Sequence, residues 1–254
     1  MRENRVRTLW ADDRPVVNGW LAIANSYSAE VMAHEDFDSL TIDMQHGMVD
    51  FQAAIAMFQA LSTRNCTPLA RVAWNDPALI MKSLDAGAYG IICPMVNTRE
   101  ECERFVGACR YAPVGYRSFG PARGILYGGA DYAAEANDTV VTLAMIETAE
   151  AMANLDAIMS VDGLDGIYVG PSDLAISLGH PPSPEPVAPD VLEAIDEILA
   201  AAARNGVKAG IHCPNGASVR EKFQRGFRFA TVTNDARLMA MAATAEIAAA
   251  RGPA

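Results

Sequence analysis

The chain has 254 residues, a formal net charge of −11 and 51% hydrophobic residues. This length suits one large domain whose core is stable without disulfides or structural metals. The acidic charge argues against binding to nucleic-acid backbones, which require a basic surface. It leaves an anionic small substrate open, because one buried arginine can hold a carboxylate inside an acidic protein.

The N-terminal segment and the cysteines indicate the cellular compartment. Residues 1–16 are rich in charge and contain no apolar signal-peptide core, so we treat them as an extension that precedes the first strand. No run of about 18 apolar residues predicts a membrane span. The five cysteines are odd in number, and no pair has zinc-ribbon spacing. We therefore expect reduced thiols in a cytoplasmic protein without a membrane partner.

Short apolar runs alternate with alanine-rich segments along the chain. Eight runs have the composition of buried parallel strands: Gly19–Ala24, Ser39–Met44, Pro68–Ala73, Gly90–Val96, Val140–Glu147, Gly166–Gly170, Lys208–Cys213 and Phe229–Asn234. Each precedes a segment of helical composition: Ala29–His34, Phe51–Leu61, Pro77–Ala86, Thr98–Tyr111, Ala149–Ser160, Pro189–Asn205, Gly216–Arg225 and Asp235–Ala250. Eight consecutive strand–helix units predict a closed (β/α)8 TIM barrel, an α/β fold, as a single domain over residues 1–254.

An open doubly wound sheet is the alternative arrangement of the same units. Such a sheet usually carries a glycine-rich nucleotide-binding turn after its first strand, and the segment Ala24–Ser28 contains no glycine. Two loops are unusually long: a glycine-rich one from about Ala112 to Tyr132 and a proline-rich one over His180–Pro189. We expect both at the carboxyl end of the barrel, as lids or subunit contacts.

Catalytic groups of such barrels lie where the strands end. Polar residues occupy these positions on five of the expected strands: Asp43, Gln45, His46, Arg71, Glu147, Asp173 and His212. Because the carboxyl ends of all the strands meet at one face, these side chains are expected to converge there. The sequence therefore predicts a single polar site at that face.

Glu147 and Asp173 follow neighbouring strands and predict a metal site. Two carboxylates, water and a keto acid bound through two oxygens complete an octahedral oxygen site, which suits Mg²⁺ or Mn²⁺ rather than tetrahedral Zn²⁺. The structural alternative places Glu147 in the first turn of the next helix and Asp173 at the start of a turn. The joint occurrence of both carboxylates at strand ends favours the metal.

Arg71 lies among apolar residues and must be paired, because an unpaired buried charge is costly. One interpretation is a structural ion pair, with Asp43 as a candidate partner. The other is stabilisation of carboxylate and enolate charge on a substrate. Asp43 and His46 also suggest an acid–base pair in which the carboxylate fixes the imidazole tautomer. A lone histidine is more often structural, but this position favours catalysis.

Two further features bear on substrate binding and on the type of mechanism: the backbone amides of one turn and the positions of the lysines. The amides of Ser172 and Asp173, in the turn Gly170–Asp173, can bind a carboxylate as a backbone nest does. A Schiff-base aldolase would instead need a lysine inside the site. The chain has three lysines, none of them well placed: Lys82, Lys208 and Lys222. A metal mechanism without an organic cofactor is therefore preferred.

Six segments follow, in the same order, a pattern found in one enzyme family: Ile42–Gly47, Ala70–Pro77, Ile91–Val96, Gly115–Pro121, Ile146–Thr148 and Val169–Leu174. The ordered set resembles the HpcH/HpaI aldolase family over nearly the whole chain, from about Gly19 onward. The resemblance implies class II pyruvate aldolases on a (β/α)8 barrel. It also implies exchange of the C-terminal helix between protomers, and hexamers built from dimers or trimers.

The resemblance also implies roles for individual residues. In that family, residues matching Glu147 and Asp173 bind the divalent metal, here expected to be Mg²⁺, Mn²⁺ or Co²⁺, with Zn²⁺ less favoured. Residues matching Asp43, His46 and Arg71 perform the acid–base and enolate chemistry. These five positions are the metal ligands and the main catalytic residues of our prediction.

Other positions match less closely. An aspartate matching Asp85 reaches a neighbouring subunit's site in the family, so we include it among the catalytic residues. Gln45 stands where many members have glutamate, Met145 where they have glutamine, and His212 where they have an apolar residue. We place these three with the turn Gly170–Pro171–Ser172–Asp173 and Arg71 among the substrate-binding residues.

The implied reaction is reversible cleavage of a 4-hydroxy-2-oxo acid to pyruvate, or a related 2-keto acid such as hydroxypyruvate, and an aldehyde. One alternative is a lyase of malyl- or citramalyl-type thioesters. Such an enzyme needs a basic entrance for the phosphates of coenzyme A, and the acidic composition of this chain does not indicate one. Another is a non-catalytic keto-acid or metal-binding protein, which would not need the acid–base pair Asp43 and His46.

Overall fold

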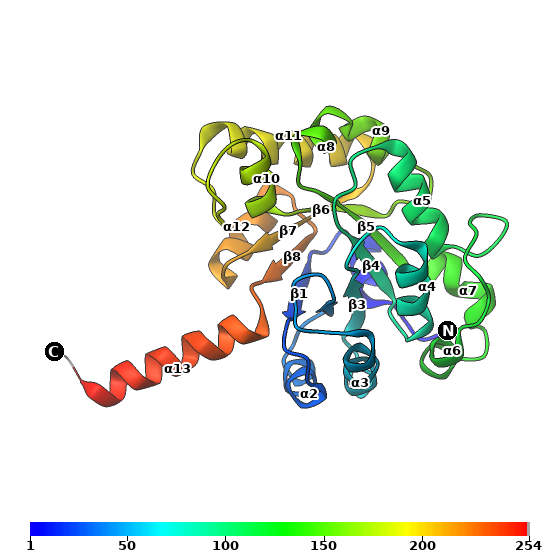
Figure 1. Ribbon diagram of the computed structural model, residues 1–254, viewed down its shortest axis with the longest axis horizontal. Coiled ribbons are helices and arrows are strands. Elements are labelled where there is room, and N and C mark those ends of the chain that lie inside the picture. The colour runs from blue at the N-terminus through cyan, green and yellow to red at the C-terminus, as the bar shows by residue number, and fades with distance from the viewer. Residues whose placement is uncertain (253–254) are drawn as a thin grey trace.

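The computed structural model describes residues 1–252. Eight parallel strands close into a barrel in sequence order (Figure 1). They are β1 (Val16–Leu21), β2 (Ser39–Asp43), β3 (Thr67–Arg71), β4 (Gly90–Cys93), β5 (Val141–Ile146), β6 (Gly166–Val169), β7 (Lys208–Cys213) and β8 (Phe229–Val232). The predicted (β/α)8 barrel is confirmed.

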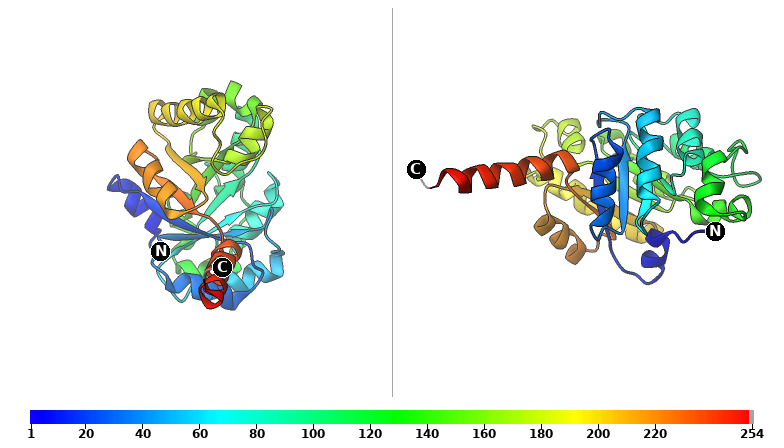
Figure 2. Two further views of the ribbon diagram at one scale, coloured as in Figure 1. Left: turned by 90° about the vertical axis from the view of Figure 1, so that its left-hand side faces the viewer. Right: turned by 90° about the horizontal axis from the view of Figure 1, so that it is seen from below.

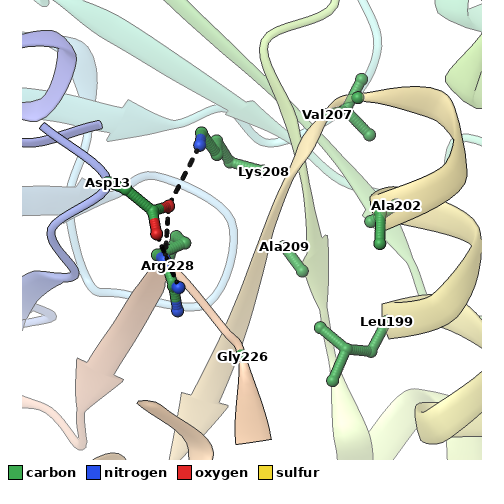
Figure 3. A pocket seen from close by; sticks show the side chains of 10 residues that line it. Asp13, Leu199, Ala202, Val207, Lys208, Ala209, Gly226 and Arg228 are labelled. Atoms are coloured by element: carbon green, nitrogen blue, oxygen red, sulfur yellow. Dashed lines mark hydrogen bonds and ion pairs between the residues drawn. The ribbon is translucent and has the colours of Figure 1, made fainter. Parts of the chain in front are cut away.

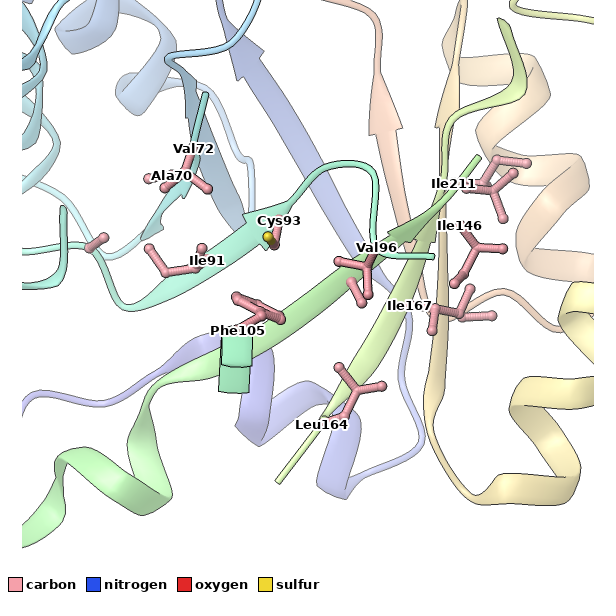
Figure 4. Packing of buried hydrophobic residues seen from close by; sticks show 14 of the residues in the cluster. Ala70, Val72, Ile91, Cys93, Val96, Phe105, Ile146, Leu164, Ile167 and Ile211 are labelled. Carbon is pink, nitrogen blue, oxygen red and sulfur yellow. The ribbon is translucent and has the colours of Figure 1, made fainter. Parts of the chain in front are cut away.

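Helices surround the barrel and bury the outward side chains of the strands. They are α2 (Ser26–His34), α3 (Phe51–Leu61), α4 (Pro77–Asp85), α5 (Arg99–Cys109), α8 (Ala149–Ala153), α9 (Leu155–Met159), α10 (Pro171–Ser177), α11 (Pro189–Asn205) and α12 (Gly216–Arg225). Ile91, Ile146 and Ile167 on the strands pack with helical residues such as Phe105 in this outer core (Figure 4). All five cysteines are buried and unpaired.

The amino end of the barrel is closed by α1 (Arg5–Ala11), which lies within the segment expected only as an extension. Asn4 caps this helix by accepting a hydrogen bond from the backbone N–H of Val6. Val6, Leu9 and Trp10 join the residues that fill the barrel interior. The amino end therefore carries a solid apolar plug.

The first strand begins and ends three residues earlier than the expected Gly19–Ala24. Polar Asn18 interrupts the apolar run in the sequence. In the structure its side chain points into the barrel and is hydrogen-bonded to Thr231, Ser39 and Thr41, so it is compatible with a buried strand.

The long segment from Ala112 to Tyr132 does not lie at the carboxyl end, as expected, but at the amino end. It connects α5 to β5, so it must return to the end where β5 begins. It contains α6 (Ala122–Gly128) and leads into α7 (Tyr132–Thr139). The carbonyl of Gly128 accepts a hydrogen bond from the backbone N–H of Arg2 (2.6 Å). The loop His180–Pro189 follows β6 and α10 and does lie at the carboxyl end, where Pro184 lines the cavity.

The last helix, α13 (Asp235–Arg251), projects away from the barrel instead of covering it (Figures 1 and 2). Asp235 is its only buried residue, and Met239, Met241 and Ile247 are exposed. No helix within residues 1–252 combines the length and apolar character that crossing a membrane requires.

Candidate active site

A cavity of about 210 Å³ opens at the carboxyl end of the barrel. Its lining comes from six strands, the loops that follow them and the segment after β8: Trp20, Ala22, Asp43, His46, Arg71, Met145, Tyr168, Gly170, Pro171, Ser172, Asp173, Pro184, His212 and Asn234. Nine of these positions are among the residues predicted to form the site. The predicted convergence of polar side chains at this end is therefore observed.

Arg71 and Asp43 form a two-pronged ion pair on the wall of this cavity. Arg71 Nε donates to Asp43 Oδ1 (2.8 Å) and Nη2 donates to Oδ2 (2.7 Å). The two residues are direct neighbours in the register of β2 and β3. Burial alone would raise the pKa of Asp43, but the hydrogen bonds and charge of Arg71 outweigh burial and hold it below its usual value. The carboxylate is therefore ionised and fixes the guanidinium.

The guanidinium of Arg71 retains a hydrogen-bond donor that is free for a ligand. Its central carbon lies 4.8 Å from the centroid of the Trp20 ring, which supports one face. Within residues 1–252, Nη1 has no hydrogen-bond partner. Arg71 is thus both a structural partner of Asp43, as one interpretation held, and a fixed cation that faces the cavity.

Asp43 contacts His46 through the backbone. We expected its carboxylate to hold the imidazole, but Oδ1 instead accepts hydrogen bonds from the backbone N–H groups of Gln45 (3.1 Å) and His46 (3.2 Å). The imidazole of His46 is exposed at the cavity mouth and makes no hydrogen bond with another described residue. Asp43 therefore fixes Arg71 and the turn that carries His46, and leaves the ring free.

Glu147 lies directly behind the cavity wall. Its side chain is buried, and Oε1 accepts a hydrogen bond from the backbone N–H of Met95 (2.9 Å). A Cβ on Gly170 would come within 2.3 Å of Oε2, so a side chain at this position would displace the carboxylate. Burial, with a further contribution from Asp173, raises the pKa of Glu147 to about 7.

These features fit a hard divalent cation. Asp173 is exposed at the cavity, and its charge contributes to the raised pKa of Glu147. Oε2 of Glu147 has no hydrogen-bond partner among the described residues. No group of three or more His, Cys, Asp or Glu side chains gathers as a metal cluster within residues 1–252. Two protein oxygens would therefore be completed by water and substrate, a donor set typical of Mg²⁺ or Mn²⁺.

The turn after β6 opens helix α10. Gly170 stands at the N-cap and Pro171 in the first turn, a position that proline tolerates because its missing N–H needs no partner there. Ser172 and Asp173 also lie in this first turn, whose amide groups have no partner within the helix. The predicted carboxylate-binding turn therefore borders the cavity.

The sequence interpretation included His212 but missed the polar residues beneath it, which form the floor of the cavity. Tyr168 stacks on Trp20, with ring centroids 5.6 Å apart, and its hydroxyl donates to Thr231 Oγ1 (2.7 Å). His212 Nδ1 lies 3.0 Å from the same hydroxyl. Asn18 Nδ2 donates to Thr231 Oγ1 (2.9 Å). These residues alternate along apolar strands, so a period of two was the signal that could have placed them inside the barrel.

The remaining predicted residues differ in where they lie. Met145 lines the cavity, whereas Gln45 is absent from its lining and contributes its backbone N–H to Asp43. Asp85 ends α4 at the amino side of the barrel, where it accepts a hydrogen bond from Arg117 Nη2 (2.8 Å). This position is remote from the cavity of the same chain.

A second cavity of about 210 Å³ lies at the amino end, between β7, β8 and α11 (Figure 3). Lys208 Nζ and Arg228 Nε approach Asp13 Oδ1 at 3.6 Å and 2.9 Å, so the cations are paired. Lys208 begins β7, at the end opposite the candidate active-site cavity. No lysine lines the candidate active-site cavity at that end.

Comparison with known proteins identifies the family. Residues 17–242 match the sequence profile described as HpcH/HpaI aldolase/citrate lyase. The chain is 46% identical over 248 residues to a hydroxypyruvate/pyruvate aldolase from Rhizorhabdus wittichii (98% of this chain, 99% of the relative). It is 38% identical to a 4-hydroxy-2-oxo-heptane-1,7-dioate aldolase from Salmonella dublin (91% and 89%).

A solved structure agrees with the sequence relatives. The crystal structure of an HpcH/HpaI aldolase/citrate lyase family protein from Burkholderia cenocepacia shares the fold with a TM-score of 0.92 and 30% identity, over 98% of this chain and 100% of that one. The motifs, the closed barrel and the full-length similarity agree. The chain belongs to the HpcH/HpaI aldolase/citrate lyase family, as its motifs predicted.

Proposed function

We propose that this aldolase reversibly cleaves a 4-hydroxy-2-oxo acid to pyruvate or hydroxypyruvate and an aldehyde. The aldolase class rests on family membership and on the names of the two curated relatives. The single observation that carries the proposal is the guanidinium of Arg71, fixed by Asp43 at the cavity that Asp173 also lines, with Glu147 directly behind it. The reaction needs no organic cofactor.

Glu147 and Asp173 are the proposed ligands of a divalent cation. Their oxygen donors favour Mg²⁺, Mn²⁺ or Co²⁺ over Zn²⁺. When bound, the cation supplies Lewis acidity at the carboxylate and keto oxygens of the substrate. Gly170 keeps the Glu147 carboxylate accessible, since any side chain there would collide with Oε2.

Arg71 stabilises the negative charge that develops on the keto oxygen during cleavage. Asp43 and the Trp20 ring hold the guanidinium in place before the substrate arrives, so little reorganisation accompanies the reaction. The free Nη1 donor supplies a hydrogen bond toward the cavity. The first-turn amides of Ser172 and Asp173 orient the substrate carboxylate.

His46 moves the proton of the C4 hydroxyl. Its exposed imidazole accepts this proton as the carbon–carbon bond breaks and returns it in the synthetic direction. Asp43 assists by anchoring the backbone N–H of His46, so it positions the turn rather than the ring. The lining of the cavity includes one arginine and no lysine, which disfavours the coenzyme A thioester alternative.

A substrate and metal screen tests this proposal. Pyruvate and hydroxypyruvate are offered with a series of aldehydes, with and without chelator, and with Mg²⁺, Mn²⁺, Co²⁺ or Zn²⁺. We expect aldol product that depends on the added cation. Turnover of malyl- or citramalyl-coenzyme A without aldol activity would support the thioester alternative. Binding of a keto acid without any turnover would support a non-catalytic protein.

The proposed assembly is a homo-oligomer, with a hexamer as the form that the family resemblance implies. The projecting helix α13 leaves Met239, Met241 and Ile247 exposed, and contact with a second copy would bury them. Asp85 is remote from its own cavity, which supports its predicted role in a neighbouring subunit's site. Mixing Asp85→Ala and His46→Ala variants tests this role: active mixed oligomers are expected, and a mixture no more active than its parts would contradict it.

A further inference from the structure

The floor of the cavity contains His212, one of whose ring nitrogens is hydrogen-bonded to a residue beneath it in the barrel interior. His212 lies at the carboxyl end of β7 and lines the cavity, with its ring edge-on to Trp20 at a centroid distance of 5.3 Å. Its Nδ1 faces the Tyr168 hydroxyl at 3.0 Å. Nε2 has no hydrogen-bond partner within the described residues 1–252. One nitrogen is therefore held by the protein and the other is free for a ligand.

The direction of the hydrogen bond between Tyr168 and Thr231 assigns the proton of the His212 ring, because the roles of its two nitrogens depend on the tautomer. A tyrosine hydroxyl has one proton, and Tyr168 donates it to Thr231 Oγ1 at 2.7 Å, a typical O–H···O distance. The same oxygen must then accept from His212, and 3.0 Å is typical of N–H···O. Nδ1 is consequently protonated, and Nε2 of the neutral ring presents a lone pair.

Burial and a neighbouring cation favour the neutral ring, and the hydroxyl pair beneath it belongs to a larger hydrogen-bond network. Asn18 Nδ2 donates to Thr231, while Ser39 and Thr41 donate to Asn18 Oδ1, so the chain of hydrogen bonds continues into the barrel interior. Burial and then the charge of Arg71 lower the pKa of His212 to about 4, so the ring is uncharged at neutral pH.

Nε2 of His212 adds an acceptor to a cavity whose proposed substrate-binding groups are donors. Arg71 and the first-turn amides are donors, which suit the carboxylate and keto oxygens of a 2-keto acid. The Asp43 carboxylate is already occupied by Arg71 and two backbone amides. Pyruvate offers oxygens that only accept and an apolar methyl group, so it gives Nε2 no donor. A hydroxyl group on the substrate would supply one.

We infer that His212 is a specificity residue that accepts a hydrogen bond from a substrate hydroxyl next to the reacting carbonyl, with Tyr168 as the positioning residue that fixes its tautomer. The inference rests on the proposed aldolase function. The hydroxyl can belong to the keto acid, as in hydroxypyruvate, or to a 2-hydroxyaldehyde. One neutral hydrogen bond corresponds to a preference of about tenfold.

The experiment compares hydroxylated and plain substrates in pairs, in the metal-loaded enzyme. One arm measures kcat/KM for hydroxypyruvate against pyruvate with propanal as acceptor. The other measures glycolaldehyde against acetaldehyde with pyruvate as donor. His212→Phe should lower the hydroxylated-to-plain ratio by about tenfold in one arm, which identifies the source of the hydroxyl. His180→Gln, a histidine outside the cavity, is the matched control and should leave both ratios unchanged.

Tyr168→Phe tests the positioning step, because it removes the hydroxyl and keeps the ring on Trp20. It should lower the same ratio. Nitrogen-15 NMR of labelled histidine should show His212 protonated at Nδ1 in the parent enzyme and lose that preference in Tyr168→Phe. A proton on Nε2 in the parent, or both ratios within twofold of the parent in folded His212→Phe, would overturn the inference.

Failure of the proposed function is distinguishable from failure of this inference. Absence of turnover with every donor would reject the aldol reaction. In that event, or if His212→Phe does not fold, the tautomer and the relative binding of hydroxypyruvate and pyruvate to the parent and Tyr168→Phe proteins still decide the role of His212. Equal affinity for the two acids in the parent, together with Nε2 protonation, would overturn it.

Discussion

The two ends of the barrel each contain a buried arginine–aspartate ion pair, and the two pairs differ in what they leave free. At the amino end, Asp165 accepts hydrogen bonds from Arg7, Arg110 and both the N–H and hydroxyl of Thr142. The arginines also donate to the carbonyls of Thr139 and Val140. This network is closed within the protein.

At the carboxyl end, Arg71 and Asp43 form an equally direct pair, but Nη1 of Arg71 has no partner in the described part of the chain. Its side chain borders a cavity rather than the plug formed by α1. A buried ion pair is by itself weak support for either stability or function. The difference between the ends shows that unused hydrogen-bonding capacity next to a cavity is the better indicator of a functional pair.

The largest effect that separates the two ends is expected from His46→Ala. Aldol cleavage should slow by about 10²–10⁴-fold, the usual range for lost acid–base catalysis. Decarboxylation of oxaloacetate should slow less, because it also forms a pyruvate enolate but has no C4 hydroxyl to deprotonate. Steady-state kinetics with both substrates measures the contrast. Equal loss of both reactions in folded, metal-loaded protein would mean that His46 organises the whole site, and His212 would be the next candidate for the proton.

Arg71→Ala should lower kcat by at least about 100-fold, the scale expected when a fixed stabiliser of developing charge is removed. Arg71→Lys should recover little, because an ammonium cannot reproduce the paired donors to Asp43. Circular dichroism checks that both variants fold. A folded Arg71→Ala enzyme with a near-normal rate would make the carboxyl-end pair as purely structural as the amino-end pair.

Arg110→Ala should show the opposite pattern at the amino end. Its guanidinium is buried and donates to Asp165 and to two carbonyls, so its loss should cost about 1.5–3 kcal/mol of unfolding free energy for each charged hydrogen bond not replaced by water. The kcat of the folded fraction should stay within about twofold of the parent. Urea denaturation gives the stability and initial rates give kcat. A large kcat loss with unchanged stability would break the distinction between the ends.

Much of the barrel could be predicted because each strand–helix unit has its own local signal. Phe51–Leu61, Pro189–Asn205 and Lys208–Cys213 were predicted with the observed bounds. The prediction failed where tertiary contacts override composition. Helix α6 was not predicted because its glycines lower the helix propensity of the segment. Helix α1 is too short for its hydrophobic periodicity to indicate that it closes the barrel.

The site shows the same division. The positions of the strand ends in the sequence were enough to predict that Asp43, Arg71 and Asp173 lie at one cavity, since parallel strands place their carboxyl ends together. The direction of each hydrogen bond could not be predicted, because it depends on strand register and side-chain rotamers. Asp43 lies beside Arg71 in the register of β2 and β3, so its carboxylate binds the guanidinium rather than the imidazole of His46.

The most direct measurement of the central claim is turnover after removal and return of divalent cations. Activity should disappear on exhaustive chelation and return with Mg²⁺, Mn²⁺ or Co²⁺, because Glu147 and Asp173 offer two carboxylates, neither of which forms an ion pair within residues 1–252. Asp173→Asn should bind the ion more weakly and need more of it. Full activity in chelated protein, with borohydride trapping a pyruvate adduct on lysine, would contradict the metal mechanism.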